Sequence, residues 1–477
     1  MVLSVRLAYG RVAGVAYLKA ESCSGQAGEP KSNGKHSASQ SRGEAKCLKN
    51  IRWKVQPATA LQVKSAKLHR GLRRRLQHWP LAGSFVLLTL IKNAEVHTPD
   101  YFGRGCVLVA GGRIIYLGKD APELDARLGC ETLDLEGAAL VPGFIDGHVH
   151  ITGGGGEDGF ATQAPSVPLS QFTRHGVTSV VGLLGTDDIT RSTSNVLARV
   201  YALRAEGLSA WCWTGGYHVP PTTFSGSVAR DVVNIEAIIG LGELAISDHR
   251  SSQPSFDEFL RMASEVHVAG LLTRKASVLH LHLGDGRRGL ELVRRALAES
   301  ELPPRVFHPT HVNRNRALFE EACELARQGV TIDVTAFPVD PIEDAWSAAD
   351  AWERYQQKRC PAAQFTVSSD GGGCLPTFDA QGELVRMEFA SSAGLPETLR
   401  ELRGRGHALQ DILPALTRNV ATLLRLRGKG RIAVGLDADL VVLDEASQVR
   451  DVMAMGQWMV RAGEVMQYGT FEQESKE

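Results

Sequence analysis

Eight short apolar stretches, each followed by a polar turn and most by a helical pattern, fill the middle of this 477-residue chain. Stretches of this length, bounded by turn residues, are typical of buried parallel strands. Strand–helix alternation repeated eight times over roughly 280 residues predicts an α/β fold, a (β/α)8 barrel of the TIM type. We expect the strands at 139–145, 177–184, 209–213, 243–246, 277–283, 305–308, 330–334 and 364–368, and helices at 227–239, 256–272, 287–299 and 317–328.

Two sets of short alternating strands flank this region. One set lies between residues 85 and 135 and the other between residues 430 and 461, both interrupted by turn residues such as Gly111 and Gly112. Strands from both ends of the chain can pair into one domain. We therefore expect the barrel at 143–425, and a small β-sandwich-like domain at 83–142 and 426–470.

The first 82 residues differ in composition from the rest. Residues 1–80 hold 16 of the 53 basic side chains but three of the 53 acidic ones, which gives that segment a net charge of +13. The segment between Gly25 and Gly43 has almost no bulky apolar residues, so we expect no packed core in this basic, low-complexity extension. An acid-free, Arg-containing start is also compatible with a mitochondrial transit peptide.

The remaining 397 residues carry a balancing charge of −13, which argues against nucleic-acid or anionic-membrane partners. The sequence contains no apolar run of about 18 residues, the length that a membrane-spanning helix needs. Its eight cysteines include no C-x-x-C pair, which favours reduced thiols over a disulfide framework. We expect a cytoplasmic protein, or a mitochondrial one if the extension is a transit segment.

Metal-type side chains gather at the ends of several expected strands. In a parallel barrel the carboxyl ends of the strands meet at one face, which is where catalytic residues lie. Two histidines two positions apart on an extended segment point to the same side, and such imidazole pairs suit Zn²⁺. The relevant strand ends read His148-Val-His150, His280-Leu-His282, His308-Pro-Thr-His311 and Ser368-Ser-Asp370.

This constellation predicts metal-assisted hydrolysis. Two divalent ions that share a carboxylate and a water would lower the pKa of that water from ~16 towards 7, producing hydroxide at neutral pH. Asp370 would orient the hydroxide, accept its proton and pass it to the leaving amine as general base and acid. The expected reaction is the hydrolysis of an amide or a related bond.

The barrel, its metal-type residues and the flanking β domain resemble the amidohydrolase superfamily. Within it, four longer stretches resemble the isoaspartyl (β-aspartyl) dipeptidases, over about residues 83–470. These stretches are Pro142-Gly-Phe-Ile-Asp-Gly-His-Val-His-Ile-Thr-Gly-Gly-Gly-Gly-Glu157, Val177-Thr-Ser-Val-Val-Gly-Leu-Leu-Gly-Thr186, Ala245-Ile-Ser-Asp-His-Arg-Ser251 and Pro309-Thr-His-Val-Asn-Arg-Asn315.

The resemblance implies a dipeptide substrate linked through the aspartate β-carboxyl, and homo-oligomeric assembly. It assigns His148, His150, His282 and His311 as metal ligands, and Asp370 as both ligand and general base. Glu157 would hold the free α-amino group, and Tyr217 would donate to the scissile carbonyl oxygen. The remaining substrate-binding residues would be Arg250 and Arg314, which clamp carboxylates, and Gly155 and Thr186, which line the pocket.

The chain departs from the family pattern at two positions. The usual bridging ligand is a carboxylated lysine on the fourth strand, where this chain has Glu243. Glutamate offers the same charge and two oxygens, so we expect it to bridge two Zn²⁺ ions per chain without CO₂. The family's serine donor to the substrate α-carboxylate is replaced by Cys374, a weaker donor.

Two alternative functions stay open at this point. Another metal-dependent amidohydrolase, acting on a cyclic amide or an N-acyl amino acid, would need no group that recognises a free amine. A non-catalytic amidohydrolase-like scaffold would have lost the metals, although in this chain only the lysine position departs from the ligand pattern.

Overall fold

The computed structural model describes residues 88–339, 343–378 and 384–472. The expected extension at 1–82 lies outside the described residues. Every element discussed below belongs to one compact unit, formed by residues 86–122 and 129–477. In the part of the chain that the structure describes, no helix combines the length and the hydropathy needed to cross a membrane.

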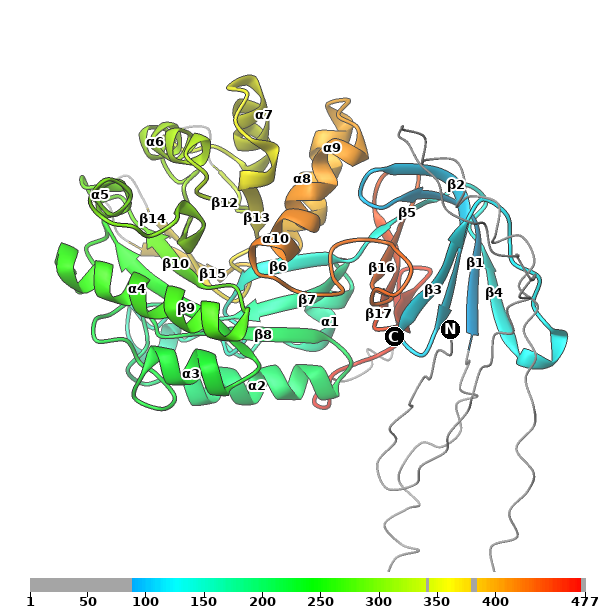
Figure 1. Cartoon of the computed structure of the whole chain (residues 1–477), viewed down its shortest axis with the longest axis horizontal. Helices are drawn as coiled ribbons and strands as arrows, with labels where there is room; N and C mark the ends of the chain where they lie inside the picture. Colours follow the sequence, from blue (N-terminus) through cyan, green and yellow to red (C-terminus); the bar gives the residue numbers. More distant parts are fainter. Residues whose placement is uncertain (1–87, 340–342, 379–383, 473–477) are drawn as a thin grey trace, which may run out of the picture. The chain divides into compact units, whose positions relative to one another are not determined.

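Eight parallel strands form the predicted barrel (Figure 1). Hydrogen-bond ladders join the first six into one sheet and the last two into a pair. The strands are β6 (Phe144–Val149), β7 (Val177–Gly182), β8 (Ser209–Thr214), β9 (Ile238–Ile246), β10 (Val278–Leu283), β11 (Phe307–Thr310), β12 (Ile332–Thr335) and β13 (Phe365–Ser368).

Single backbone contacts link the two ladders into a ring. The amide of Val312, just after β11, donates to the Asp333 carbonyl in β12 at 3.4 Å. The amide of His150, just after β6, donates to the Gly371 carbonyl after β13 at 2.8 Å. The first and last strands therefore meet at the end of the barrel where the metal-type residues lie, and the (β/α)8 prediction is confirmed.

Ten α-helices of the described residues connect or follow the strands, and Figure 1 shows α2, α3 and α4 alongside β8 and β9. Side chains accept backbone N–H groups at the N-termini of five of these helices, with a full capping box at α4. They are α1 (Leu169–Thr173), α2 (Thr193–Ala205), α3 (Val228–Asn234), α4 (Phe256–Thr273), α5 (Glu291–Glu299), α6 (Arg316–Arg327), α7 (Ala348–Gln357), α8 (Gly394–Gly404), α9 (Leu409–Leu416) and α10 (Arg418–Leu423).

Strands from both ends of the chain form a separate sheet of nine strands, as the sequence predicts. The two sets join where β5 pairs in parallel with β1 and antiparallel with β16. Its strands are β1 (Leu88–His97), β2 (Tyr101–Ala110), β3 (Arg113–Gly118), β4 (Cys130–Asp134), β5 (Ala139–Pro142), β16 (Leu440–Leu443), β17 (Val449–Ala454), β18 (Gln457–Arg461) and β19 (Glu464–Val465).

The single strand expected at 139–145 is two strands in the structure. β5 belongs to the nine-stranded sheet, whereas β6 opens the barrel. Gly143 separates them and lies so close to β7 that a Cβ atom there would meet the Thr178 hydroxyl at 2.2 Å. The apolar run is continuous in sequence, but the chain passes from one sheet to the other at this glycine.

The helix expected at 227–239 is too long, because α3 ends at Asn234. Lys275 binds the backbone where α3 ends. Its Nζ donates to the carbonyls of Val232, Ile235 and Ile238 at 2.5, 2.5 and 2.9 Å. The residues that follow enter β9, which starts five positions before the expected 243–246. The expected helix at 287–299 also starts late, at Glu291, after a left-handed turn at Gly289.

An antiparallel hairpin after the last barrel strand was not predicted. Its strands are β14 (Cys374–Phe378) and β15 (Leu384–Phe389), and Cys374 pairs with Phe389. The hairpin begins four residues after Asp370, so it lies next to the expected site in the chain.

Candidate active site

The structure places every predicted site residue at the carboxyl end of the barrel strands or in the loops that follow. His148 lies within β6, Glu243 within β9 and His282 within β10, while His150, His311 and Asp370 follow β6, β11 and β13. Most of the expected substrate-binding residues lie in the loops after β6, β7, β8, β9 and β11, and one begins the hairpin strand β14 after β13: Gly155, Glu157, Thr186, Tyr217, Arg250, Arg314 and Cys374.

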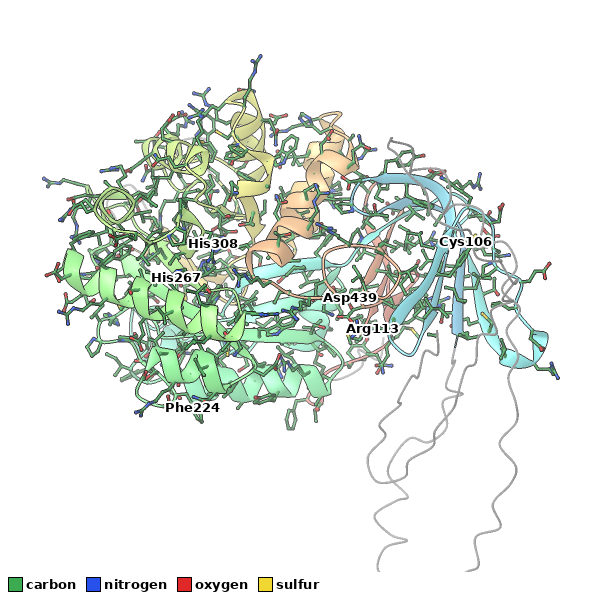
Figure 2. All side chains as sticks on the ribbon, in the orientation of Figure 1. Cys106, Arg113, Phe224, His267, His308 and Asp439 are labelled. Carbon is green, nitrogen blue, oxygen red and sulfur yellow. The ribbon has the colours of Figure 1, made fainter. Side chains whose placement is uncertain are left out.

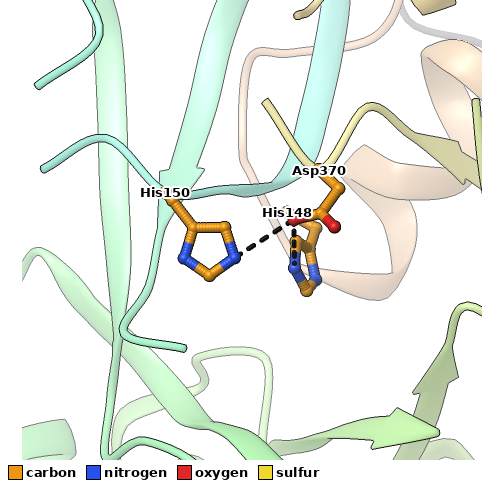
Figure 3. Close-up of side chains that lie close together, drawn as sticks. All are labelled: His148, His150 and Asp370. Atoms are coloured by element: carbon orange, nitrogen blue, oxygen red, sulfur yellow. Dashed lines mark ion pairs between the residues drawn. The ribbon is translucent and has the colours of Figure 1, made fainter. Parts of the chain in front are cut away.

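Three of the expected ligands meet around one carboxylate oxygen. Asp370 Oδ1 lies 3.3 Å from His148 Nε2 and 3.1 Å from His150 Nε2 (Figure 3). A second group shares His148, whose Nε2 also lies 3.6 Å from Glu243 Oε2. His311 Nε2 lies 3.0 Å from the other oxygen, Glu243 Oε1. Both groups could hold a metal ion, and His148 belongs to both of them.

His282 joins this second group through Glu243. Its Nδ1 lies 2.7 Å from Glu243 Oε1 and 2.7 Å from the Tyr217 hydroxyl. Its Nε2 lies 2.8 Å from Asp248 Oδ2. The structure therefore brings all six expected ligands to one end of the barrel, although His282 is not a member of either three-residue group that could hold an ion.

Unpaired buried atoms show that the donor set fits a divalent metal. His148 Nε2, Glu243 Oε2 and Asp370 Oδ1 lack a hydrogen-bond partner of suitable geometry, yet face one another at 3.3–3.6 Å. Buried polar groups without partners are rare and costly. Imidazole nitrogens and carboxylate oxygens converging on one point are the ligands that Zn²⁺ and similar ions take.

Burial and charge control the protonation of the two carboxyls. Burial raises the pKa of Glu243 well above its usual value, and the Asp370 charge adds to the shift. Burial also opposes ionisation of Asp370, but its interactions with His148 and His150 outweigh burial and hold its pKa well below the ordinary value. Asp370 is thus an ionised base, while Glu243 needs nearby positive charge to ionise, which a metal ion would provide.

His282, His311 and Tyr217 are neutral donors and acceptors. Burial lowers the pKa of His282 to about 3 and that of His311 well below its usual value. Burial, helped by the Glu243 charge, raises the pKa of Tyr217 well above 10, so its hydroxyl keeps a proton to donate. Neutral imidazole is the form that ligates metals.

A charged cluster lies next to the ligands. Arg250 donates from Nη2 to Asp248 Oδ2 at 2.8 Å and from Nη1 to Glu157 Oε1 at 3.1 Å. Thr186 Oγ1 donates to the same Glu157 oxygen at 3.2 Å. The Arg250 guanidinium also lies 5.5 Å from the Tyr217 ring centre. Two residues expected to bind opposite ends of a substrate, Glu157 and Arg250, therefore neutralise each other here.

Arg314 and Cys374 contact other residues of the site. Arg314 Nη1 donates to the Leu283 carbonyl at 2.6 Å and lies 3.5 Å from His282 Nε2. Gly155 adopts a left-handed backbone (φ 79°), and a Cβ there would meet Cys374 Sγ at 2.3 Å. Burial and the Glu157 charge raise the pKa of Cys374 to about 11, so it stays a thiol at neutral pH.

Several polar residues at the site were not predicted to be functional. Asp248 was not among the predicted site residues, but it contacts both His282 and Arg250. His280 and His308 lie on the expected strands without an assigned role. In the structure His280 contacts His148, and His308 contacts His280. The alternation of side chains along a strand could have indicated His280, because His280 and His282 point to the same face of the sheet. The contact partners depend on other strands, which sequence reasoning does not locate.

Comparisons with known proteins agree with this geometry. The sequence pattern of the amidohydrolase family matches residues 139–459. A β-aspartyl dipeptidase from Fervidobacterium islandicum AW-1, solved in complex with β-Asp-Leu, is 40% identical, with a TM-score of 0.75 over 81% of this chain and 100% of that one. A second structure of that enzyme is 38% identical, with a TM-score of 0.73 and the same coverage.

A more distant curated relative is adenine deaminase 2 of Carboxydothermus hydrogenoformans, which is 23% identical over 76% of this chain and 55% of that protein. The dihydropyrimidinase of Brevibacillus agri, 18% identical with a TM-score of 0.57 over 80% of this chain and 97% of that one, shows the fold alone. The family match covers most of the chain, and the resemblance to β-aspartyl dipeptidases is confirmed at 38–40% identity. This chain therefore belongs to the amidohydrolase family.

Proposed function

We propose that the protein is a metal-dependent β-aspartyl dipeptidase. One observation carries the proposal: the chain is 40% identical to a β-aspartyl dipeptidase over that enzyme's full length. The contacts of Arg250 with Glu157 and with the Tyr217 ring, beside the expected metal ligands, support it. These three side chains are not generic metal ligands. They match the polar groups of a dipeptide, namely a free amine, a carboxylate and a scissile carbonyl.

We further propose two zinc ions per chain. His148, His150 and Asp370 would hold one. Glu243 and His311, which form a group with His148, would hold the other together with His282, which contacts Glu243. Bound divalent ions supply Lewis-acid polarisation of a carbonyl and lower the pKa of water. In this proposal Glu243 replaces a carboxylated lysine, because its two oxygens face separate histidines.

The residues of the chain move the protons. The ionised Asp370 carboxylate accepts the proton of the attacking water and returns it to the leaving amine. Tyr217 keeps its hydroxyl proton and donates it in a hydrogen bond to the scissile carbonyl oxygen as negative charge develops there. Glu157 binds the substrate's ammonium group, and Arg250 and Arg314 bind carboxylate. Thr186, Gly155 and Cys374 shape the pocket around them.

The alternative functions are not favoured. Relatives that hydrolyse cyclic amides, such as the dihydropyrimidinase, match at 18% identity and share the fold alone. A metal-free scaffold would not need unpaired donor atoms to converge inside the barrel. Homo-oligomeric assembly, the absence of nucleic-acid and membrane partners and the cytoplasmic location stay predictions, and light scattering of the purified protein tests the first of them.

Hydrolysis of β-Asp-Leu beside α-Asp-Leu, with metal-depleted and zinc-restored protein, tests the proposal. We expect zinc-dependent cleavage of the β-linked peptide alone, with about two zinc ions per chain by elemental analysis. Cleavage of neither peptide by protein with two bound metals would shift the proposal to another amide substrate. Absence of both metal and cleavage would support the scaffold.

A further inference from the structure

A continuous chain of buried side chains leads from His148 into the barrel interior. His148 Nδ1 lies 2.7 Å from His280 Nε2, and His280 Nδ1 lies 2.9 Å from His308 Nδ1. His308 Nε2 lies 3.1 Å from the Thr366 hydroxyl, which donates to Asp333 Oδ1 at 2.6 Å. All five side chains belong to residues no more than 2% exposed. His308 is labelled within the helix-covered barrel in Figure 2.

A backbone carbonyl determines the direction of the first two hydrogen bonds. His280 Nδ1 also lies 3.2 Å from the carbonyl oxygen of His308, which can only accept. His280 Nδ1 therefore carries the proton of the neutral ring, and His280 Nε2 accepts. His148 must then donate from Nδ1, which leaves its Nε2 with a lone pair facing Glu243 and Asp370.

The carboxylate at the other end gives the same direction independently. Asp333 Oδ2 accepts from the hydroxyls of Thr310 and Ser368 at 2.7 and 2.5 Å, and Asp333 Oδ1 accepts the Thr366 proton. With its own proton used, the Thr366 oxygen accepts from His308 Nε2. His308 Nδ1 is thereby left as the acceptor for His280 Nδ1. Every donor in this hydrogen-bonded series therefore points away from the metal site.

Packing fixes the orientation of the middle ring as well. The Trp213 ring stacks on His280 with centroids 5.0 Å apart and planes 12° apart. The indole Nε1 of Trp213 donates to the Gly147 carbonyl at 3.4 Å, next to His148 in β6. The tautomer and the plane of His280 are therefore both determined by the fold.

We propose that His280, supported by His308, Thr366 and Asp333, is a positioning residue that presets His148 to present its Nε2 lone pair to the metal site. The inference rests on the proposed metal-dependent function, and it adds residues that touch neither metal nor substrate. Groups that orient metal-ligating histidines commonly change metal affinity by ~10–100-fold when removed.

Two matched pairs of variants test this proposal. Thr366→Val removes the hydroxyl at similar volume, whereas Thr366→Ser restores it. His280→Leu removes the acceptor for His148, whereas His280→Gln can place an amide oxygen near the position of Nε2. Thr331→Val is the control, because the buried Thr331 hydroxyl donates to Gln364 at 2.6 Å just before β12 and β13, at the opposite end of these strands from Asp370.

The readouts are the apparent affinity for Co²⁺ by chelator competition, the visible absorption of the Co²⁺-loaded protein, the Tm of the metal-free protein and, separately, kcat and KM. We expect His280→Leu to weaken Co²⁺ binding by about 10–100-fold and to change the absorption spectrum, while His280→Gln stays within about fivefold of the parent. Thr366→Val should weaken binding by roughly threefold to tenfold, with Thr366→Ser within about twofold. The control should lower Tm without changing affinity or spectrum.

Equal Co²⁺ affinity and spectra in Thr366→Val and Thr331→Val would show that Thr366 and Asp333, beyond His308, do not help to position His148. Equal loss in His280→Leu and His280→Gln would overturn the role of the acceptor. If Thr366→Val does not fold, the His280 pair still decides the central link. A parent protein that binds no Co²⁺ would refute the proposed function instead, so the two failures are distinguishable.

Discussion

The mouth and the interior of the barrel hold their polar side chains by different forces. At the mouth, Arg250 contacts Glu157 and Asp248, and the side chains of Arg250 and Glu157 are 27% and 28% exposed. In the interior, His148 and His280 are fully buried and are held by a directed hydrogen bond between their rings. Charge pairing near water is adaptable and weakened by salt, whereas buried hydrogen bonds allow one geometry.

This difference matches two tasks. A substrate with charged ends must enter, displace the Glu157–Arg250 contact and leave again. A partly exposed ion pair permits this exchange because it is weak. A metal ligand must keep one tautomer and one ring orientation through every turnover. Variants of the interior should therefore change metal binding and kcat, while variants of the mouth should mainly change KM.

Asp370→Asn should give the largest effect. The amide cannot accept the water's proton, so we expect kcat for β-Asp-Leu to fall by about 10²–10⁴-fold, the usual contribution of a general base. Steady-state kinetics in saturating zinc measure it, with metal content determined on the same sample. Retention of more than a tenth of the parent kcat would remove Asp370 from the proton-transfer role.

Glu243→Gln should come next and should test the interior directly. The substitution removes the negative charge that faces His148, His282 and His311, so we expect the bound zinc to fall below two per chain and kcat to fall by roughly 10–100-fold. Added bicarbonate should change neither parent nor variant, because no lysine carbamate is involved. Bicarbonate stimulation of the parent would contradict a bridging role for Glu243.

Glu157→Gln should separate the mouth from the interior. Loss of the carboxylate should raise KM for β-Asp-Leu by about 10-fold or more at unchanged zinc content, since a charge-assisted contact is worth ~1.5–3 kcal/mol. N-acetylated β-Asp-Leu provides the matched control on the substrate side. The parent should discriminate strongly against it and the variant weakly; equal discrimination by both would mean that Glu157 does not read the amine.

Salt should affect the two regions differently. Raising NaCl from about 0.05 to 0.5 M shortens the screening length to roughly 4 Å, so KM should rise severalfold. Zinc retention against a fixed chelator concentration should stay constant, because five of the six expected ligands are buried. A salt-dependent loss of zinc with unchanged KM would reverse the assignment of the two regions.

Cys374→Ser should give the smallest effect. The thiol, whose pKa burial raises to about 11, is protonated at neutral pH and donates only weakly. A hydroxyl is a better donor of similar size, so we expect KM to fall by at most about threefold with kcat unchanged. A large loss of kcat would show that the thiol takes part in the reaction.

Much of the barrel and of the candidate site follows from local patterns. Strand-sized apolar runs indicate β7, β8, β10 and β13 to within about two residues, because the periodicity is strong there. The His-x-His pattern indicates that His148 and His150 face the same side, and the barrel rule predicts that Asp370 meets them. The structure brings these three within 3.1–3.3 Å.

Errors occur where a distant residue overrides the local pattern. The apolar run at 139–145 is interrupted at Gly143 because Thr178, on the next strand, approaches its backbone. The helix expected at 227–239 ends early because Lys275, some 40 residues later, binds its carbonyls. Neither partner can be recognised from the sequence around the affected segment.

The sequence by itself determined the kind of chemistry, since residue types at strand ends are readable wherever the strands repeat. Only the tertiary structure decided which partners these residues meet. Asp248 pairs with His282, and His280 connects His148 to Asp333. The physical reason is that a hydrogen bond requires its donor and acceptor to be placed to within a few tenths of an ångström by strands far apart in the chain, whereas the strand pattern depends only on neighbouring residues.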